Sequence, residues 1–134
     1  MADTPMSVAI AFVEAINAAD LSALRRLMTE DHTFIDTLGN HFSGADQMIV
    51  GWQNFFLAYP DYRIQIRHAF ADGMFAGIFG HGEGKWRVDD KILPGSWSVA
   101  TAWLAEIEAG QVKTWRVFGD TGWAAPPGAS YKDR

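Results

Sequence analysis

The spacing of the apolar residues changes at Pro60, and this change constrains the fold more than any other feature of the sequence. Before Pro60, apolar residues recur at helical spacing, as in Leu21, Leu24 and Leu27. After Pro60 they alternate with polar residues, as in the segment YRIQIRHAF, which is the pattern of half-buried strands. Helices followed by a meander of strands indicate an α+β fold and not an alternating α/β fold.

The part before Pro60 is predicted to contain three helices and one short strand. Thr4, which precedes a proline, is a suitable N-cap for the first helix. Asp20 is placed to cap a second helix over 21–28, and Ser43 a third helix that ends at the next proline. A short strand is expected at 33–37, between the second and the third helix.

Four long antiparallel strands are predicted after Pro60, over 62–70, 74–88, 96–107 and 111–119. The second of them contains several glycines, which indicate β-bulges or a strongly bent sheet. Two prolines and small residues near the end predict a loose tail over about 124–134. We therefore expect one domain over 1–134.

Composition and charge exclude several classes of function. The chain has no cysteine, which rules out a thiolate nucleophile, a disulfide scaffold and a cysteine-ligated zinc ion. The net charge of -5 argues against a nucleic-acid partner or an anionic membrane. Neither a signal peptide nor a long apolar segment stands out, so we expect no membrane partner and a cytoplasmic location.

Four segments of the chain carry a recognisable pattern: AFVEAINAADLSALRRLMTED, HTFIDTLGNHFSG, FFLAYPDYRIQ and GQVKTWRVFGDTG. In their order and spacing they resemble the SnoaL-like polyketide cyclases and ketosteroid isomerases of the nuclear transport factor 2 superfamily. The resemblance implies a cone-shaped α+β barrel with three N-terminal helices on a strongly curved, mostly antiparallel sheet. It also implies an open, mostly apolar pocket between these layers, which serves many chemistries in the superfamily.

Two aspartates are the first candidates for acid/base catalysis. Asp120 follows the last predicted strand, where the resemblance implies the carboxylate of the cyclases, although GDTG is also a good turn sequence. Asp36 lies where the isomerases hold their base, and its alternative is an aspartate that initiates a turn. Carboxyls among aromatic rings have raised pKa values and suit proton transfer near neutral pH. An epoxide hydrolase of this fold uses an Asp-Arg-Asp set, of which Asp120 and Arg116 could supply a part.

Two histidines are further catalytic candidates. His68 is predicted on the apolar side of its strand, either as a hydrogen-bonded core imidazole or as a proton shuttle. The cyclases often carry a histidine in a GTHTG segment, and here GHGEG shifts it by one position to His81. That shift reverses the side chain unless a bulge compensates, and Glu83 then competes for the role. No histidine spacing is typical of a metal site, so we expect neither metal nor cofactor.

The chain also departs from the isomerases. Their oxyanion is held by a tyrosine of the first helix and an aspartic acid of the third long strand. The tyrosine position falls at Phe12, and SVATAWLAEI has no carboxyl before Glu106. A phenylalanine cannot donate a hydrogen bond, so steroid isomerisation by the family mechanism is not expected.

Aromatic residues make up 13% of the chain, and we expect them to divide between core, pocket and a dimer face. Tryptophans on the outer face of the sheet would form an apolar patch that a second copy covers, which predicts a homodimer through that face. The residues expected to grip an apolar or aromatic small molecule are Phe12, Trp52, Phe56, Trp86, Trp103, Trp115, Arg116 and Phe118.

Two functions remain open from the sequence. The first is a cofactor-free enzyme that resembles the SnoaL-like cyclases and performs an aldol-type ring closure or an isomerisation by general acid/base catalysis. The second is a binding protein of the same fold without catalysis. An enzyme should place Asp36 or Asp120 inside the pocket with a raised pKa, whereas a binding protein should keep polar groups only at the rim.

Overall fold

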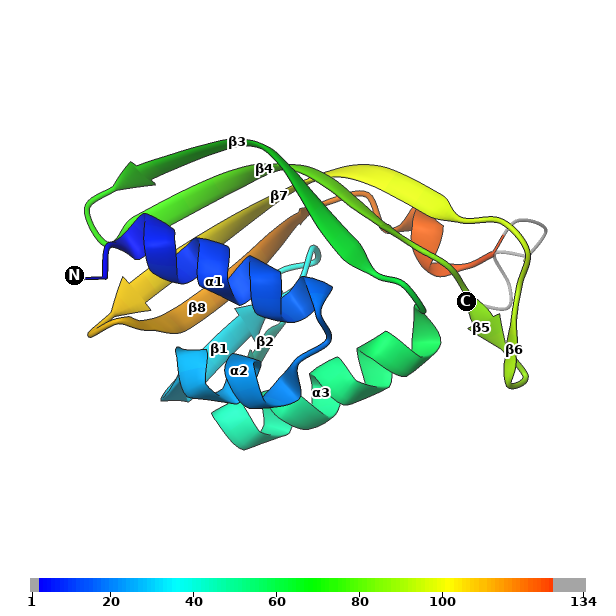
Figure 1. Cartoon of the computed structure of the whole chain (residues 1–134), viewed down its shortest axis with the longest axis horizontal. Helices are drawn as coiled ribbons and strands as arrows, with labels where there is room; N and C mark the ends of the chain where they lie inside the picture. Colours follow the sequence, from blue (N-terminus) through cyan, green and yellow to red (C-terminus); the bar gives the residue numbers. More distant parts are fainter. Residues whose placement is uncertain (1–2, 127–134) are drawn as a thin grey trace.

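The computed structural model of the chain describes residues 3–126 (Figure 1). Its helices are α1 (Pro5–Asn17), α2 (Leu21–Leu27), α3 (Ala45–Ala58) and the short 3-10 helix η1 (Gly122–Ala124). Its strands are β1 (Met28–Ile35), β2 (His41–Ser43), β3 (Arg63–Asp72), β4 (Phe75–Gly84), β5 (Arg87–Val88), β6 (Lys91–Ile92), β7 (Trp97–Glu108) and β8 (Gln111–Gly119). None of the helices in this part of the chain is long and apolar enough to cross a membrane.

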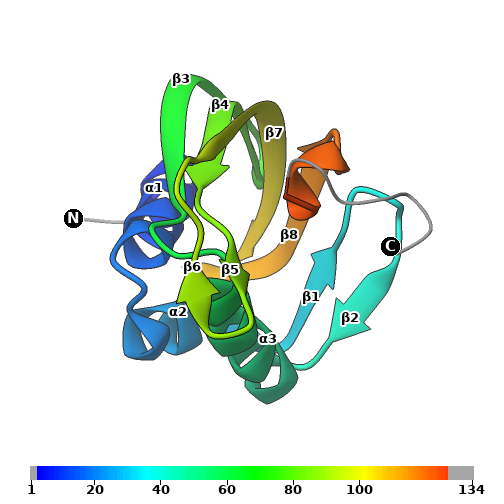
Figure 2. The same cartoon turned by 90° about the vertical axis from the view of Figure 1, so that its right-hand side faces the viewer.

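Six strands form one curved sheet in the order β2-β1-β8-β7-β4-β3. Neighbouring strands are antiparallel except β1 and β8, which run parallel. In Figure 1 the sheet arches over α1, α2 lies in front of β1 and α3 lies below them, and the view from the side shows the strands curling around the helices (Figures 1 and 2). The predicted α+β fold, with three helices on a strongly curved and mostly antiparallel sheet, is confirmed.

A bulge and a glycine help to bend the sheet between β3 and β4. The register shifts between Ile66 and His68 on β3, opposite the glycine-rich half of β4. A Cβ at Gly80 would lie 1.8 Å from the carbonyl oxygen of Gln65, so no other residue fits there without moving β3. The bulge expected from the glycines is therefore present, on the partner strand.

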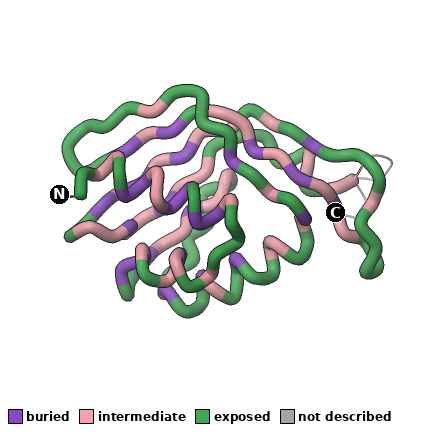
Figure 3. The backbone as a smooth tube through the Cα atoms, viewed as in Figure 1, coloured by how far each residue is buried: buried purple, intermediate pink, exposed green. Residues whose placement is uncertain are grey.

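The core lies between α1 and the concave face of the sheet. Phe12 is fully buried, and its ring centroid is 4.8 Å from that of Trp115 on β8. Buried and exposed residues alternate along β4 and β7, as expected for strands with one covered face (Figure 3). At the start of α1, Thr4 Oγ1 accepts a hydrogen bond from the backbone N–H of Ser7 at 3.0 Å, which confirms the predicted N-cap.

Several predicted boundaries are wrong. Met28 belongs to β1 and not to the second helix, because an apolar residue one turn after Leu24 fits a helix and a buried strand equally well. The N-cap of α3 is Gly44, whose φ is 105°, whereas Ser43 ends β2, with its hydroxyl 2.9 Å from that of Thr33. The strand predicted over 74–88 ends at Gly84, and β5 pairs with β6 in a separate ribbon.

The chain beyond β8 packs back onto the end of the sheet. The rings of Trp123 and Trp97 stack with their centroids 4.0 Å apart and an interplanar angle of 20°. Trp86 Nε1 donates a hydrogen bond to the carbonyl of Trp123 at 2.7 Å, and the hydroxyl of Tyr59 donates to Ala124 at 3.1 Å. Residues 124–126 of the predicted tail are described, and 127–134 lie outside the described residues.

Candidate functional site

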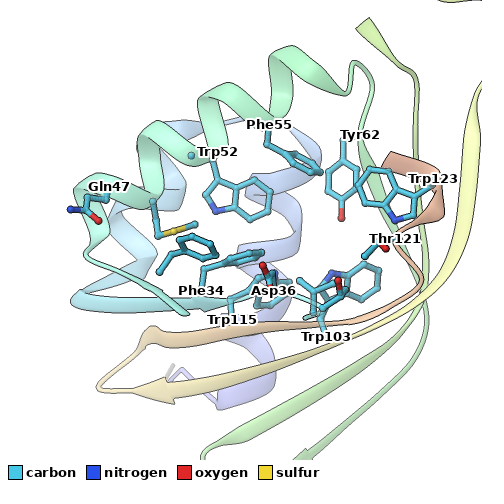
Figure 4. Close-up of a pocket in the computed structure, with 15 residues that line it drawn as sticks. Phe34, Asp36, Gln47, Trp52, Phe55, Tyr62, Trp103, Trp115, Thr121 and Trp123 are labelled. Carbon is cyan, nitrogen blue, oxygen red and sulfur yellow. The ribbon is translucent and has the colours of Figure 1, made fainter. Parts of the chain in front are cut away.

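An apolar cavity of about 450 Å³ lies between α3, β1 and the concave face of β7 and β8 (Figure 4). Its volume is within the range of small-molecule sites in proteins. The lining residues are Phe34, Asp36, Thr37, Phe42, Gln47, Met48, Gly51, Trp52, Phe55, Tyr62, Trp103, Trp115, Val117, Thr121 and Trp123.

The two long walls of this cavity follow from helix and strand periodicity. On α3, Trp52 and Phe55 are three positions apart, so both face the sheet, and their rings meet edge to face at 5.6 Å. On the sheet, Trp103 pairs with Val117, and Trp115 lies two positions before Val117 on β8, so these side chains share the concave face. The cavity therefore has aromatic side chains on both walls.

Two indole N–H groups in these walls lack a hydrogen-bond partner within residues 3–126. They are Nε1 of Trp52 and Nε1 of Trp115, and both residues are almost completely buried. A buried donor without an acceptor is unfavourable by about 1–3 kcal/mol. Both nitrogens have almost no accessible surface, so these N–H groups lie inside the walls and do not face the open space of the cavity.

Asp36 lies just beyond β1 at one side of the cavity, and its carboxylate is held in a turn. Oδ1 accepts hydrogen bonds from the backbone N–H groups of Leu38 and Asn40, each at 2.9 Å, and Oδ2 accepts one from Asn40 Nδ2 at 3.1 Å. Desolvation favours the neutral acid, but the hydrogen bonds from Asn40 and Leu38 outweigh it and lower the pKa of Asp36 below its usual value. The raised pKa expected of a catalytic carboxyl is therefore wrong for Asp36, which is ionised at neutral pH.

Tyr62 places a hydroxyl in the same cavity from the segment between α3 and β3. Figure 4 shows this hydroxyl directed toward the side of the cavity that holds Trp103 and Thr121. Burial raises the pKa of Tyr62 far above its usual value, and a hydrogen bond with Trp103 opposes this only weakly. The phenol therefore stays protonated and can donate a hydrogen bond.

Asp120 does not line the large cavity. It lies directly after β8, exposed, in a hollow of about 30 Å³ that shares Tyr62 and Trp123 with the cavity. Its Oδ1 accepts a hydrogen bond from the backbone N–H of Gly122 at 2.7 Å, which is the turn arrangement expected of GDTG.

Both candidate histidines lie on the outer face of the sheet. His68 is exposed and stacks on Phe70 with an interplanar angle of 12°. His81 pairs with Ala100 on β7 in an unbroken register, and Glu83 follows it on the same face, where it accepts a hydrogen bond from Gln65 at 2.8 Å. The bulge lies on β3, so it does not return His81 or Glu83 to the cavity.

The predicted ligand-gripping residues fall into three groups. Trp52, Trp103 and Trp115 line the cavity. Three others lie behind its walls: Phe12 is in the core, Phe56 packs on Trp52, and Trp86 holds the chain after β8. The remaining two are on the outer face, where the guanidinium carbon of Arg116 is 4.9 Å from the ring centre of Phe118.

The expectation that strand tryptophans contribute to the outer face is wrong. Trp97, Trp103 and Trp115 are at most 5% exposed and lie on the concave side. The outer face instead exposes phenylalanines, among them Phe70, Phe79 and Phe118. By strand alternation Trp115 lies on the opposite face from Arg116 and Phe118, but alternation does not say which face is concave.

The sequence analysis did not identify several residues that line the cavity, although helical spacing or strand alternation could have indicated some of them. Phe55 shares the face of Trp52 by helical spacing, and Val117 shares the face of Trp115 by strand alternation. Trp123 had no such signal, because it follows the last strand in a segment without periodicity. Tyr62 begins the strand predicted over 62–70, and its proximity to Trp103 is a tertiary contact.

Within residues 3–126, no three histidine, aspartate or glutamate side chains gather closely enough to hold a metal ion. The ionisable groups of the cavity are Asp36 and the phenol of Tyr62. The arrangement can therefore bind an apolar molecule, accept a proton or hydrogen bond at Asp36 and donate a hydrogen bond from Tyr62.

Solved structures share this fold. A ketosteroid isomerase-like protein from Catenulispora acidiphila, in complex with trimethylamine, matches with a TM-score of 0.78, 17% identity and coverage of 90% of this chain and 91% of that one. A candidate polyketide cyclase from Pseudomonas putida matches with a TM-score of 0.77, 20% identity and coverage of 91% and 96%. A candidate SnoaL-like polyketide cyclase from Shewanella denitrificans matches with a TM-score of 0.79, 15% identity and coverage of 89% and 92%.

These identities are low, so the matches show a common fold and not a common reaction. No curated protein matches the sequence. The family model of the SnoaL-like domain matches residues 9–117. This range begins within α1, ends near the end of β8 and includes most of the residues that line the cavity. The chain therefore belongs to the SnoaL-like domain family.

Proposed function

We propose that this protein is a cofactor-free enzyme that binds an apolar or aromatic small molecule in the cavity and abstracts a proton from it with Asp36. The observation that carries the proposal is an ionised carboxylate at the side of an otherwise apolar, aromatic cavity. Asp36 thereby takes the leading role over Asp120, which lies in the neighbouring hollow.

The hydrogen bonds of Asp36 leave it able to accept a proton. A carboxylate has about four acceptor sites. The turn uses two on Oδ1 and one on Oδ2, so one site on Oδ2 stays free. In the proposed step a C–H bond next to a ligand carbonyl breaks, the proton moves to Oδ2, and the electron pair forms an enolate. In an aldol-type closure the enolate carbon attacks a second carbonyl, and the resulting alkoxide takes the proton back from Asp36. In an isomerisation Asp36 returns the proton to another carbon of the enolate.

Binding without catalysis is the second candidate, and the same turn favours it. The pKa of Asp36 is lowered, whereas a tuned acid/base carboxyl has a raised pKa, and Asp120 is exposed. Trimethylamine, the ligand of the Catenulispora neighbour, shows that a protein of this fold can hold a small amine. An aromatic cavity with one carboxylate at its side also suits such a cation.

Hydrogen–deuterium exchange into a ketone distinguishes these candidates. The probe is 2-acetylnaphthalene in D2O, and NMR follows the loss of its methyl protons, which the proposed base removes. Binding is measured separately by the quenching of tryptophan fluorescence, since four tryptophans line the cavity. We expect exchange with the natural protein and at least about a hundredfold slower exchange with Asp36→Asn, at similar affinity.

Asp120→Asn is the matched control, because it makes the same chemical change at the other predicted carboxylate. It should leave exchange within about twofold of the natural rate, a small change on the scale of general-base effects. Exchange lost in Asp120→Asn and kept in Asp36→Asn would transfer the base to Asp120. Binding without exchange in any variant would support the non-catalytic candidate.

We also propose that two copies pair through the outer face of the sheet. Phe70, Phe79 and Phe118 are 65%, 48% and 43% exposed and lie on neighbouring or nearby strands of that face. Register supports one continuous row, since Phe79 pairs with Ala102, which pairs in turn with Phe118. Exposed rings in such a row are typical of an interface between copies.

A further inference from the structure

We infer that the hydroxyl of Tyr62 is the hydrogen-bond donor that selects ligands with a carbonyl oxygen inside the cavity. The inference rests on the proposed ligand-binding function and deepens it, because it names the chemical group that the cavity recognises.

The ring of Tyr62 is held firmly by its neighbours. Its centroid is 4.7 Å from that of Phe55, edge to face, and 5.8 Å from that of Trp97. A donor on a fixed ring loses little conformational freedom when it binds an acceptor. Tyr62 can therefore direct its hydroxyl to one position in the cavity.

Space for an acceptor remains beside this hydroxyl. Tyr62 lines both the cavity and the adjoining hollow. On the facing strand β4, Gly82 has no side chain, and a Cβ there would lie 3.6 Å from the Tyr62 hydroxyl oxygen. Glycine at this position thus keeps a side chain from packing against the phenol.

The chemistry of the other lining residues favours an uncharged acceptor on the ligand. Among the described lining residues there is no lysine, arginine or histidine, so nothing there neutralises an anion. A neutral ketone or aldehyde on an aromatic body matches the neutral hydroxyl donor of Tyr62 within an apolar surface.

The position of Tyr62 also suits the proposed proton abstraction. In Figure 4, Tyr62 enters from the side of α3 and Asp36 from the side of β1. A ligand whose carbonyl oxygen accepts from Tyr62 would bind more tightly as its enolate forms, because negative charge develops on that oxygen. Asp36 would meanwhile receive the proton.

Two ligands of nearly equal shape test the inference. They are 2-acetylnaphthalene and 2-isopropenylnaphthalene, in which a CH2 group replaces the carbonyl oxygen. Affinities are measured by the quenching of tryptophan fluorescence. Tyr62→Phe removes only the hydroxyl and keeps the ring, so we expect it to weaken binding of the ketone by about tenfold and to change binding of the alkene by less than about twofold.

Tyr59→Phe is the matched control, because Tyr59 also packs on Phe55 but its hydroxyl donates to Ala124 and does not line the cavity. It should affect the ketone and the alkene equally. Equal loss of both ligands in Tyr62→Phe, or no loss of the ketone, would overturn the inference while the proposed function stands. If neither ligand binds the natural protein at all, the proposed function fails together with the inference.

Discussion

At the scale of single residues, the surroundings of each polar group in and near the cavity decide whether that group is charged or neutral. Asp36 keeps its charge because several N–H groups point at its carboxylate. Tyr62 is buried among rings and stays neutral. His32 on β1 is fully buried beneath α1, and burial lowers its pKa, although a hydrogen bond to Val112 and the nearby Asp31 oppose this. The buried imidazole is therefore neutral in the folded protein at pH 7.

The neutral state of His32 predicts loss of stability in mild acid. Above its usual pKa of about 6.5, the imidazole is neutral in the folded and in the unfolded chain. Between that pH and the lower pKa of the folded state, His32 is protonated in the unfolded chain but neutral in the folded chain. The free energy of unfolding should therefore fall by up to about 1.4 kcal/mol per pH unit.

His32→Asn tests this effect, because an amide can still donate to the carbonyl of Val112, which Nδ1 contacts at 2.7 Å. Urea unfolding between about pH 7 and about pH 5 should show a shallower pH dependence in His32→Asn. His68→Asn changes an exposed histidine and should keep the dependence of the natural protein. Parallel pH profiles for all three proteins would contradict the role assigned to His32.

At the scale of elements, the glycines of β4 have different roles although they share one strand. Gly80 lies against the backbone of β3 at the bulge, where a Cβ would be 1.8 Å from the carbonyl oxygen of Gln65. A Cβ at Gly77 would lie 3.6 Å from the nearest atom, which belongs to the ring of Phe79, and this is an ordinary van der Waals contact. The close approach of β3 and β4 thus requires glycine at position 80 but not at position 77.

Alanine substitutions separate these two positions. Gly80→Ala should lower the free energy of unfolding by at least about 2 kcal/mol, because either β3 or β4 must move. Gly77→Ala should change it by less than about 1 kcal/mol, and its effect includes the better strand propensity of alanine. Urea unfolding of both variants measures the difference. Equal stabilities would show that the bulge accommodates a side chain.

At the scale of the whole molecule, the sheet presents two different faces. The concave face holds the tryptophans and the cavity, whereas the outer face exposes phenylalanines. Phe79 lies between Phe70 and Phe118 on that outer face, since its ring centroid is 6.2 Å from that of Phe70 and its strand neighbour Ala102 pairs with Phe118. A pair of copies joined there would leave both cavities untouched.

Phe79→Glu should therefore convert a dimer to a monomer, because it places two like charges in an apolar contact. Sedimentation velocity measures the mass in solution. Leu57→Glu is the control, since Leu57 is similarly exposed on α3, away from the outer sheet face. A natural protein that sediments as a monomer, or a Phe79→Glu variant that stays dimeric, would contradict the interface.

Local pattern was enough to predict most elements of the fold. The strand over 111–119 matches β8, the cap at Thr4 is confirmed, and the glycines of β4 correctly indicated a bulge. These features depend on residues close together in the chain, whose spacing or backbone freedom is visible in the sequence. The wrong boundaries are at Met28 and Ser43, where the local sequence is compatible with a helix and with a strand.

The sequence by itself determined the class of fold, the family and the aromatic character of any site. Tertiary structure decided which residues make that site: it placed Asp36 and Tyr62 in the cavity, Asp120 in the neighbouring hollow and His81 outside. Alternation reports only that two residues share a face of a strand. Which face is concave depends on contacts between distant segments, such as the packing of Phe12 of α1 on Trp115 of β8, and no local pattern contains those contacts.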